Sequence, residues 1–162
     1  MLLAVLTISD RCSQGLLTDT AGPAVAALLH TIWPEAEILS ALLPDDELQI
    51  AAELERLSDL GAALILTAGG TGLGPRDRTP EATLRVLDRQ APGLAEAMRS
   101  LCAVKTPAAW LSRAVAGLRV RTLILNLPGS RRGAEESLTT ILPLLRHALE
   151  VAAGSQSHPL EP

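Results

Sequence analysis

The sequence predicts an α/β fold in three layers, with a mostly parallel open sheet flanked by helices. Short runs of Leu, Ile, Val and Ala alternate along the chain with longer segments of helical period, which is typical of a sheet covered by helices. The chain has 162 residues, of which 48% are hydrophobic and 20% charged, as expected for one globular domain with a full core. We expect one domain over residues 1–154, whereas the terminal SQSHPLEP lacks a core-forming pattern and is expected to fray.

The first half of the chain is predicted to form strands and helices in alternation. Asp19 is expected to cap a helix that ends near Pro34, because proline disfavours the helical conformation in the residue before it. Either Asp45 or Asp46 is expected to cap a second helix, which Gly61 ends. The strands predicted in this half are residues 2–9, 36–43 and 62–66.

The second half is predicted to begin with a loop that leads into a helix. Thr79 is a good N-cap with Pro80 at the first helical position, so we expect a helix over residues 79–90 that Pro92 and Gly93 break. The remaining predictions are a helix over residues 94–104, a less regular stretch containing TPAAWLSRAVAG, a buried strand within RTLILNLPGS, and a helix that Pro143 interrupts and that runs to Gly154.

Composition and charge exclude several classes of protein. The net charge of −4, the pI of 5.3 and the absence of Phe and Tyr disfavour a nucleic-acid partner. Cys12 and Cys102 stand far apart without a CxxC or Cys/His cluster, so we expect free thiols in a reducing compartment. The N-terminal apolar run ends after about eight residues, too short for a signal peptide or membrane span. We therefore expect a cytoplasmic protein with no membrane partner.

The stretch TAGGTGLGPRDRTPEAT, residues 67–83, carries four glycines between a predicted strand and a predicted helix. Glycine lets the backbone approach a ligand closely, and the start of the helix favours an anion. A P-loop would need Lys-Ser/Thr at Pro75-Arg76, and a dinucleotide fingerprint would need its last glycine at Pro75, so both are excluded. A phosphate site is favoured over the alternative of a mobile surface turn.

This stretch resembles the signature TTGGTG-GPRDVTPEA of molybdopterin adenylyltransferases and related molybdenum-cofactor biosynthesis proteins, which include the G domain of gephyrin. The resemblance covers nearly the whole chain, because LTISDRCSQG…DTAGP, LLPDD, PGLAEAMR, LSRAVAG and NLPGSRRGAEESLTTILPLLRHAL also resemble family segments in order. Ala68 replaces a Thr, Leu94 replaces an aromatic residue, and the match between Lys105 and Trp110 is weak.

The resemblance implies an α/β domain that assembles as a homotrimer and joins molybdopterin to AMP. The substrates would be molybdopterin and ATP with Mg²⁺, and pyrophosphate would be released. A transient contact with the molybdenum-inserting enzyme is a further expectation. Asp45 and Asp77 match the family's functional aspartates and are expected to be catalytic by holding Mg²⁺. Taken alone, Asp45 would more readily be interpreted as a helix cap.

The expected ligand-binding residues lie at the ends of the predicted strands. Arg76 is expected in the anion site, although it would also fit a solvated surface cation. The run at residues 128–130 has two equal interpretations, a simple N-cap or part of the pterin-phosphate site. Ser112 and Arg113 match the family only through LSR, and no role is assigned to them. The full set is Ser9, Asp10, Gly69, Gly70, Thr71, Gly72, Gly74, Arg76, Pro128, Gly129 and Ser130.

Three alternative functions stay open at this point. The first is a sister protein of the same pathway that binds molybdopterin without adenylylating it. The second is a trimeric scaffold, and the third is a nucleotide-binding sensor without turnover, which would not need paired aspartates. The sequence also leaves open whether tungsten replaces molybdenum.

Overall fold

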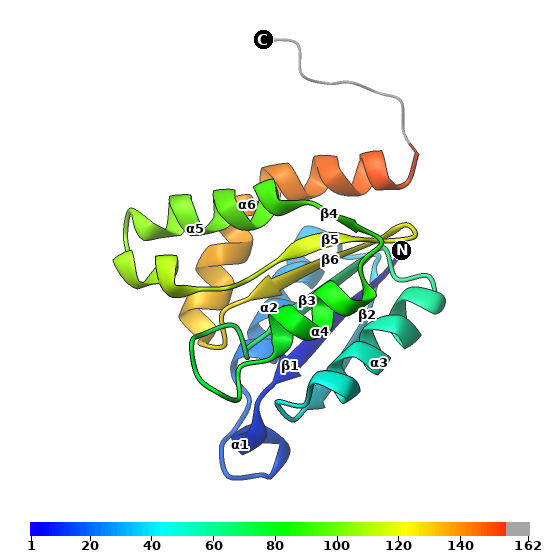
Figure 1. Ribbon diagram of the computed structural model, residues 1–162. Helices are drawn as coiled ribbons and strands as arrows, with labels where there is room; N and C mark the ends of the chain where they lie inside the picture. Colours follow the sequence, from blue (N-terminus) through cyan, green and yellow to red (C-terminus); the bar gives the residue numbers. More distant parts are fainter. Residues whose placement is uncertain (155–162) are drawn as a thin grey trace.

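A single sheet of six strands forms the centre of the protein, in the order β2-β1-β3-β6-β5-β4 (Figure 1). The structure is a computed structural model and describes residues 1–154; the tail predicted for residues 155–162 lies outside the described residues. Strands β1, β2, β3 and β6 are parallel, while β5 and β4 add an antiparallel edge. The mostly parallel sheet is therefore confirmed. Its strands are Leu2–Ile8 (β1), Glu37–Leu43 (β2), Leu64–Ala68 (β3), Arg89–Gln90 (β4), Ala116–Arg119 (β5) and Thr122–Leu127 (β6).

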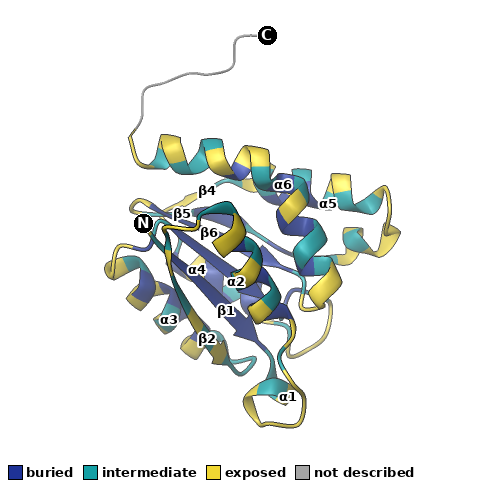
Figure 2. Cartoon of the chain, turned by 180° about the vertical axis from the view of Figure 1, so that it is seen from behind, coloured by how far each residue is buried: buried dark blue, intermediate teal, exposed yellow. Residues whose placement is uncertain are grey.

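Helices cover both faces of this sheet. Helices α3 and α4 lie on one face, and α2, α5 and α6 pack on the other (Figures 1 and 2). Within residues 1–154, no helix is both long and apolar enough to cross a bilayer. The helices are Asp10–Ser13 (α1), Ala21–Ile32 (α2), Glu47–Asp59 (α3), Thr79–Val86 (α4), Pro92–Ala103 (α5), the 3₁₀ turn Pro107–Leu111 (η1) and Arg131–Ala152 (α6).

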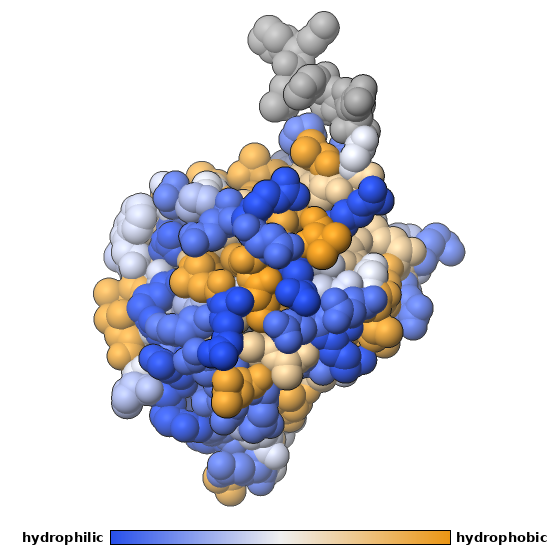
Figure 3. All heavy atoms as spheres, turned by 45° about the vertical axis from the view of Figure 1, so that its right-hand side comes forward, coloured by the Kyte–Doolittle hydropathy of each residue, from blue (hydrophilic) through white to orange (hydrophobic). Residues whose placement is uncertain are grey.

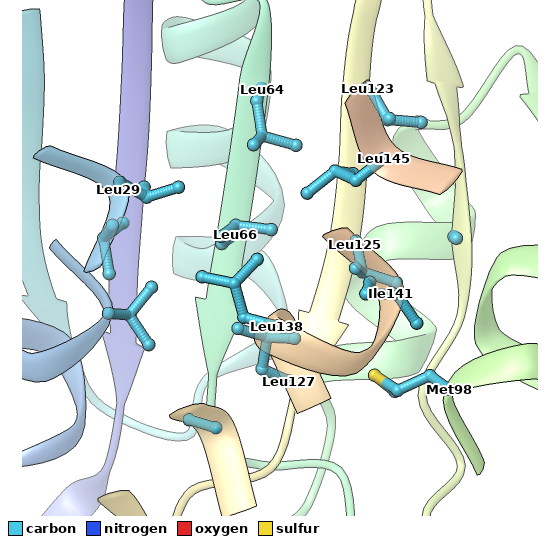
Figure 4. Close-up of a cluster of buried hydrophobic side chains, with 14 of the residues drawn as sticks. Leu29, Leu64, Leu66, Met98, Leu123, Leu125, Leu127, Leu138, Ile141 and Leu145 are labelled. Carbon is cyan, nitrogen blue, oxygen red and sulfur yellow. The ribbon is translucent and has the colours of Figure 1, made fainter. Parts of the chain in front are cut away.

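The core consists of two hydrophobic layers, one on each face of the sheet. Leu3 and Val5 of β1 face the layer of α2, α5 and α6, whereas Leu6 and Ile8 face α3 and α4. Figure 4 shows the first layer, where Leu138 and Ile141 of α6 lie over the strands. Because both faces are covered, the strands are continuous apolar runs. On the face shown in Figure 3, hydrophobic residues form patches among hydrophilic ones, as is usual for a globular surface.

The antiparallel edge is the part of the fold that the sequence prediction missed. The helix predicted over residues 79–90 ends at Val86, and Arg89–Gln90 forms the edge strand β4. Strands β5 and β6 form a hairpin in which Arg119 pairs with Thr122. Val120 in its two-residue turn has φ +53. Such turns are recognised in sequences by Asn-Gly or Asp-Gly, so Val-Arg carried no turn signal.

Two predicted helix boundaries also differ. Thr79 is not the N-cap of α4 but its first helical residue, and its hydroxyl donates to the carbonyl of Gly69 at 2.9 Å. Helix α5 begins at Pro92 rather than after it, because a proline at the first helical position loses no helical hydrogen bond. The interruption predicted at Pro143 is absent, because α6 is one continuous helix that ends at Ala152 rather than Gly154 and has Ile141 and Leu145 buried on either side of Pro143.

Candidate active site

Strands β1, β2, β3 and β6 end at the same edge of the sheet (Figure 1). Residues that follow these strands line two adjoining cavities. Their volumes are about 570 Å³ and about 460 Å³. In doubly wound α/β folds this edge is where ligands bind. Both cavities are lined by four of the predicted site residues, Gly70, Asp77, Gly129 and Ser130.

Most of the remaining predicted residues line one of the two cavities. Gly74 and Arg76 line neither of them. The larger cavity adds Thr71, Gly72 and Pro128. The smaller cavity adds Ser9, Asp10, Asp45 and Gly69.

The start of the glycine loop has a backbone that only glycine readily adopts. Gly69 has φ +115 and Gly70 has φ +62, in the region that is unfavourable for residues with a Cβ. A Cβ on Gly69 would overlap the carbonyl oxygen of Ile8, and a Cβ on Gly70 would overlap the hydroxyl of Thr79. These two glycines therefore allow the loop to lie directly against β1 and α4.

Later in the loop, the carboxylate of Asp77 folds back against the glycine backbone. Its Oδ2 accepts a hydrogen bond of 2.8 Å from the N–H of Gly74. Cβ atoms on Gly72 and Gly74 would lie 2.9 and 2.8 Å from this oxygen. The later glycines thus make room for the Asp77 carboxylate, which reaches the wall shared by the cavities.

Asp45 and Asp10 are held together by two reciprocal hydrogen bonds. Asp45 Oδ2 accepts from the N–H of Asp10 at 2.8 Å, and Asp10 Oδ1 accepts from the N–H of Asp45 at 3.0 Å. The neighbouring Asp46 caps α3 by accepting from the N–H of Gln49 at 2.9 Å. Because Asp46 is the cap, the Asp45 side chain is available to the cavity that it lines.

Arg76 reaches across the edge of the site to Asp10. Its Nε and Nη2 donate to the two carboxylate oxygens of Asp10 at 3.0 and 3.1 Å. These hydrogen bonds hold the pKa of Asp10 below its ordinary value. Arg76 is two-thirds exposed and lines neither cavity, so in this arrangement it neutralises Asp10 rather than facing a ligand.

Asp45 has the opposite pKa shift from Asp10. Burial raises the pKa of Asp45, and the negative charges of Asp10 and Asp77 raise it further, despite the hydrogen bond from the Asp10 backbone and the charge of Arg76. A cation placed between Asp45 and Asp77 would relieve this repulsion.

A magnesium ion fits these residues only when a ligand supplies further oxygens. Among residues 1–154, no three His, Cys, Asp or Glu side chains are grouped so that they could hold a metal ion. Magnesium bound with a nucleotide needs only one or two protein carboxylates, because phosphates and water complete its shell. Asp45 and Asp77 each use Oδ2 in a backbone hydrogen bond, and the Oδ1 atoms could serve as these ligands.

At the end of β6, the N-cap interpretation of residues 128–130 is confirmed, and their role in a pterin-phosphate site stays a prediction. Ser130 caps α6, since its hydroxyl accepts from the N–H of Gly133 at 3.2 Å. It also lines both cavities. A Cβ on Gly129 would lie 3.0 Å from the Cα of Gly69. The two loops therefore touch, and the N-terminus of α6 faces the same site as the glycine loop.

Several lining residues were not predicted as site residues. Asp19 accepts from the N–H groups of Ala21 and Gly22, both at 3.0 Å, and from the Thr7 hydroxyl at 2.6 Å, so it fixes the start of α2 beside the smaller cavity. Asp19 lies in DTAGP, one of the segments that resemble the family, and this resemblance could have indicated that Asp19 lies near the site. The other lining residues not predicted for the site include Cys12, Thr18 and Thr20 in the smaller cavity, and Cys102, Ser112, Arg132, Glu136 and Ser137 in the larger one.

Comparison with known proteins identifies the family. A family model described as "Probable molybdopterin binding domain" matches residues 4–147. The chain belongs to this family. The expected relationship to molybdenum-cofactor biosynthesis proteins is confirmed, and the chain has a role in that biosynthesis.

Two relatives and one solved structure illustrate the relationship. The chain is 40% identical over 138 residues to molybdopterin adenylyltransferase of Escherichia coli K12, covering 84% of this chain and 71% of that protein. It is 39% identical over 157 residues to gephyrin of Dictyostelium discoideum, covering 91% of this chain but only 22% of gephyrin, so it spans about a fifth of that relative's length. The structure of the molybdopterin biosynthesis enzyme MoaB of Thermus thermophilus matches with a TM-score of 0.87 and 50% identity, over 94% of this chain and 96% of that one.

Proposed function

We propose that this protein is a molybdopterin adenylyltransferase that uses MgATP. The observation that carries the proposal is the pair of cavities that share Gly70, Asp77, Gly129 and Ser130 as a common wall. A reaction between two bound molecules requires their reacting atoms to meet. Ligands that occupy the two cavities would meet beside Asp77.

In the proposed reaction, an oxygen of the molybdopterin phosphate attacks the α-phosphorus of ATP. A new P–O bond forms, the bond from the α-phosphorus to the oxygen bridging to the β-phosphate breaks, and pyrophosphate leaves. A phosphate monoester has a second pKa of about 6, so it is already ionised near neutral pH and needs no general base. The protein must therefore bring two polyanions together and stabilise the charge that develops.

The residues of the site suit this task. Backbone N–H groups of the glycine loop and the N-termini of α4 and α6 would bind phosphate oxygens. Asp45 and Asp77 would hold Mg²⁺, which when bound would offset the charge of the ATP phosphates. Because burial and nearby negative charge raise the pKa of Asp45, this carboxyl must lose its proton before it can ligate a metal, so activity should fall in acid.

A direct assay tests the proposal. The protein is incubated with molybdopterin and MgATP, and adenylylated molybdopterin and pyrophosphate are measured by mass spectrometry and a coupled assay. We expect both products in equal amounts, and neither when Mg²⁺ is removed by EDTA. A protein that binds molybdopterin but forms neither product would contradict the proposal.

A second candidate function is a molybdopterin-binding sister that does not adenylylate. The observation in its favour is that the chain is 50% identical to the Thermus protein MoaB, whose name specifies molybdopterin biosynthesis but no adenylyl transfer, and 40% identical to the Escherichia coli adenylyltransferase. The paired aspartates beside the shared wall favour the enzyme, because binding of the pterin phosphate alone needs no metal carboxylates.

The wider expectations belong to the same proposal. We infer that residues 1–154 act as one domain, that the chain forms a homotrimer, and that it works in the cytoplasm with a transient contact to the molybdenum-inserting enzyme. Light scattering across micromolar concentrations tests the assembly, where a mass near the 17.0 kDa of one chain would contradict the trimer.

A further inference from the structure

Arg113, which lines neither cavity, binds the glycine loop at Thr71 and Gly72 and again at Asp77. Its backbone N–H donates to the carbonyl of Thr71 at 2.9 Å. In its side chain, Nε donates to the carbonyl of Gly72 at 2.7 Å, and Nη2 donates to the carbonyl of Asp77 at 2.6 Å. One residue from the segment before β5 thus binds three carbonyls of a loop that is 41 residues away from it at Gly72.

These contacts determine which way the loop presents its amides. In a trans peptide the C=O and the following N–H point in opposite directions. The carbonyls of Thr71, Gly72 and Asp77 are turned toward Arg113, so the N–H groups that follow them point away from it. These are the N–H groups of Gly72, Leu73 and Arg78. Gly72 and Asp77 line the larger cavity, but Arg113 lines neither cavity. Arg113 therefore contacts the loop and not the interior of either cavity.

The guanidinium of Arg113 is itself fixed by α4. Its Nη1 forms an ion pair with Glu81 Oε1 in the first turn of that helix. Burial raises the pKa of Glu81, but the hydrogen bond from Arg113, a backbone hydrogen bond and the charges of Arg113 and Arg78 together hold its pKa below the ordinary value. Glu81 Oε2 is buried without a hydrogen-bond partner in the described part of the chain. The ion pair with Arg113 therefore favours the charged form of this carboxylate and ties the guanidinium to α4.

The segment that carries Arg113 is anchored on the core side. Val115 exchanges two hydrogen bonds of 3.1 Å with Asn126, whose backbone N–H donates to the Val115 carbonyl and whose Oδ1 accepts from the Val115 N–H. Arg99 donates to the carbonyl of Ala114 at 2.7 Å. The backbone that carries the Arg113 side chain is therefore held in place by Asn126 of β6 and Arg99 of α5.

We propose that Arg113 is a positioning residue that holds the glycine loop and Asp77 in the arrangement needed for adenylyl transfer. The inference rests on the proposed function for its kinetic test, but its structural test is independent of it. Only the planar fork of arginine can bind two carbonyls and a carboxylate at once. Lysine keeps the charge but cannot span these three partners.

The test compares Arg113→Lys with two other variants. Glu81→Gln keeps a hydrogen-bond acceptor for the guanidinium but removes its charge. Arg85→Lys is the matched control. Arg85 lies on α4, as Glu81 does, but it pairs with Glu47 and lines neither cavity. We expect Arg113→Lys to lower kcat by about tenfold or more, with KM for MgATP changed by less than about threefold. Glu81→Gln should have a smaller effect, and Arg85→Lys none.

Hydrogen exchange separates positioning from a general structural role. In Arg113→Lys, the amides of residues 71–78 should exchange faster, while those of β1 and β3 keep their protection. A lower melting temperature with kcat per folded molecule unchanged, or unchanged exchange in the loop, would overturn the inference. If the wild-type protein forms no adenylylated product, the proposed function fails, and the exchange data together with calorimetric binding of molybdopterin still decide the role of Arg113.

Discussion

The loop after β3 and the loop after β1 reach the same edge of the sheet but are held differently. The β3 loop is fixed along its length, because the carbonyls of Gly69, Gly72 and Asp77 all accept hydrogen bonds from side chains. The β1 loop contains only the single turn α1, and its Leu16 and Leu17 are 74% and 49% exposed. The β3 loop is thus held by side chains from other segments along its length, whereas the β1 loop is held mainly at its two ends.

This difference suggests that the two loops have different functions, one in charge stabilisation and the other in ligand entry. Amides that must stabilise a developing charge act best when they are already oriented. The β3 loop fulfils this condition. The β1 loop is held at one end by the pairing of Asp10 with Asp45 and at the other by Asp19, so we expect it to move when a ligand enters or leaves the smaller cavity.

Removal of the aspartates should have the largest effect. Asp45→Ala or Asp77→Ala is expected to lower the adenylylation rate by roughly a hundredfold or more, as when one preorganised electrostatic element is lost. Molybdopterin affinity, measured by calorimetry, should change little. The matched control is Asp46→Ala, which removes the α3 cap and should cost about 1 kcal/mol of stability without affecting the rate. Normal turnover in both aspartate variants would exclude the metal-site assignment.

Two glycine substitutions compare the loops directly. Gly70 and Gly15 have similar positive φ angles of +62 and +73, but a Cβ on Gly70 would overlap Thr79, whereas a Cβ on Gly15 would meet nothing within 4 Å. Gly15→Ala should lower the free energy of unfolding by about 1 kcal/mol through backbone strain alone. Gly70→Ala should lower it by about 3 kcal/mol, because steric overlap adds to this strain. Equal losses in urea denaturation would show that the β3 loop is not tightly held.

Breaking the ion pair that joins the loops should have a moderate effect. Arg76→Gln frees Asp10, and we expect KM for MgATP to rise a few-fold, on the order of one lost charge contact. The pKa of Asp10 is lowered in the folded protein, so its charge contributes stability above the ordinary Asp pKa of about 3.9, and this is lost as the pH falls through the folded value. As the pH falls below about 4, the free energy of unfolding should therefore decrease less steeply in the variant than in the wild type. An unchanged pH profile would mean that the pair does not persist in solution.

The smallest expected effect is a gain of stability. The pKa of Asp45 is raised in the folded protein by burial and neighbouring charge. The folded state then binds the proton more tightly, so the charged form lowers stability at pH above the folded pKa. Without Mg²⁺, Asp45→Asn should raise the melting temperature at pH 7, and this gain should vanish below the ordinary Asp pKa of about 3.9. A lower melting temperature at pH 7 would contradict the assignment of Asp45 as a repelled carboxylate.

Local sequence patterns were sufficient for most of the fold. The parallel strands are apolar runs. Asp46 is the N-cap of α3, and Asp19, although Thr20 stands between it and α2, accepts hydrogen bonds from the first two N–H groups of α2. The β4–β5 edge was not predictable in this way, because Arg89–Gln90 has no strand pattern and becomes a strand only by pairing with Gly117 and Leu118. The cap of α4 was misplaced because the Thr79 hydroxyl is used by the preceding loop.

The sequence by itself determined the alternation of strands and helices, the glycine loop at a strand end and the aspartates that accompany it, since each of these is written within a short stretch of chain. Only the tertiary structure decided which side chains pair with one another and which line the cavities. The partners Asp10 and Asp45, Arg113 and Gly72, and Arg76 and Asp10 are separated by 35, 41 and 66 residues. They meet because the parallel strands bring their carboxyl ends to one edge, and the antiparallel β5 begins at that same edge just after Arg113. No local sequence pattern shows which side chain will contact a loop and which will face a cavity.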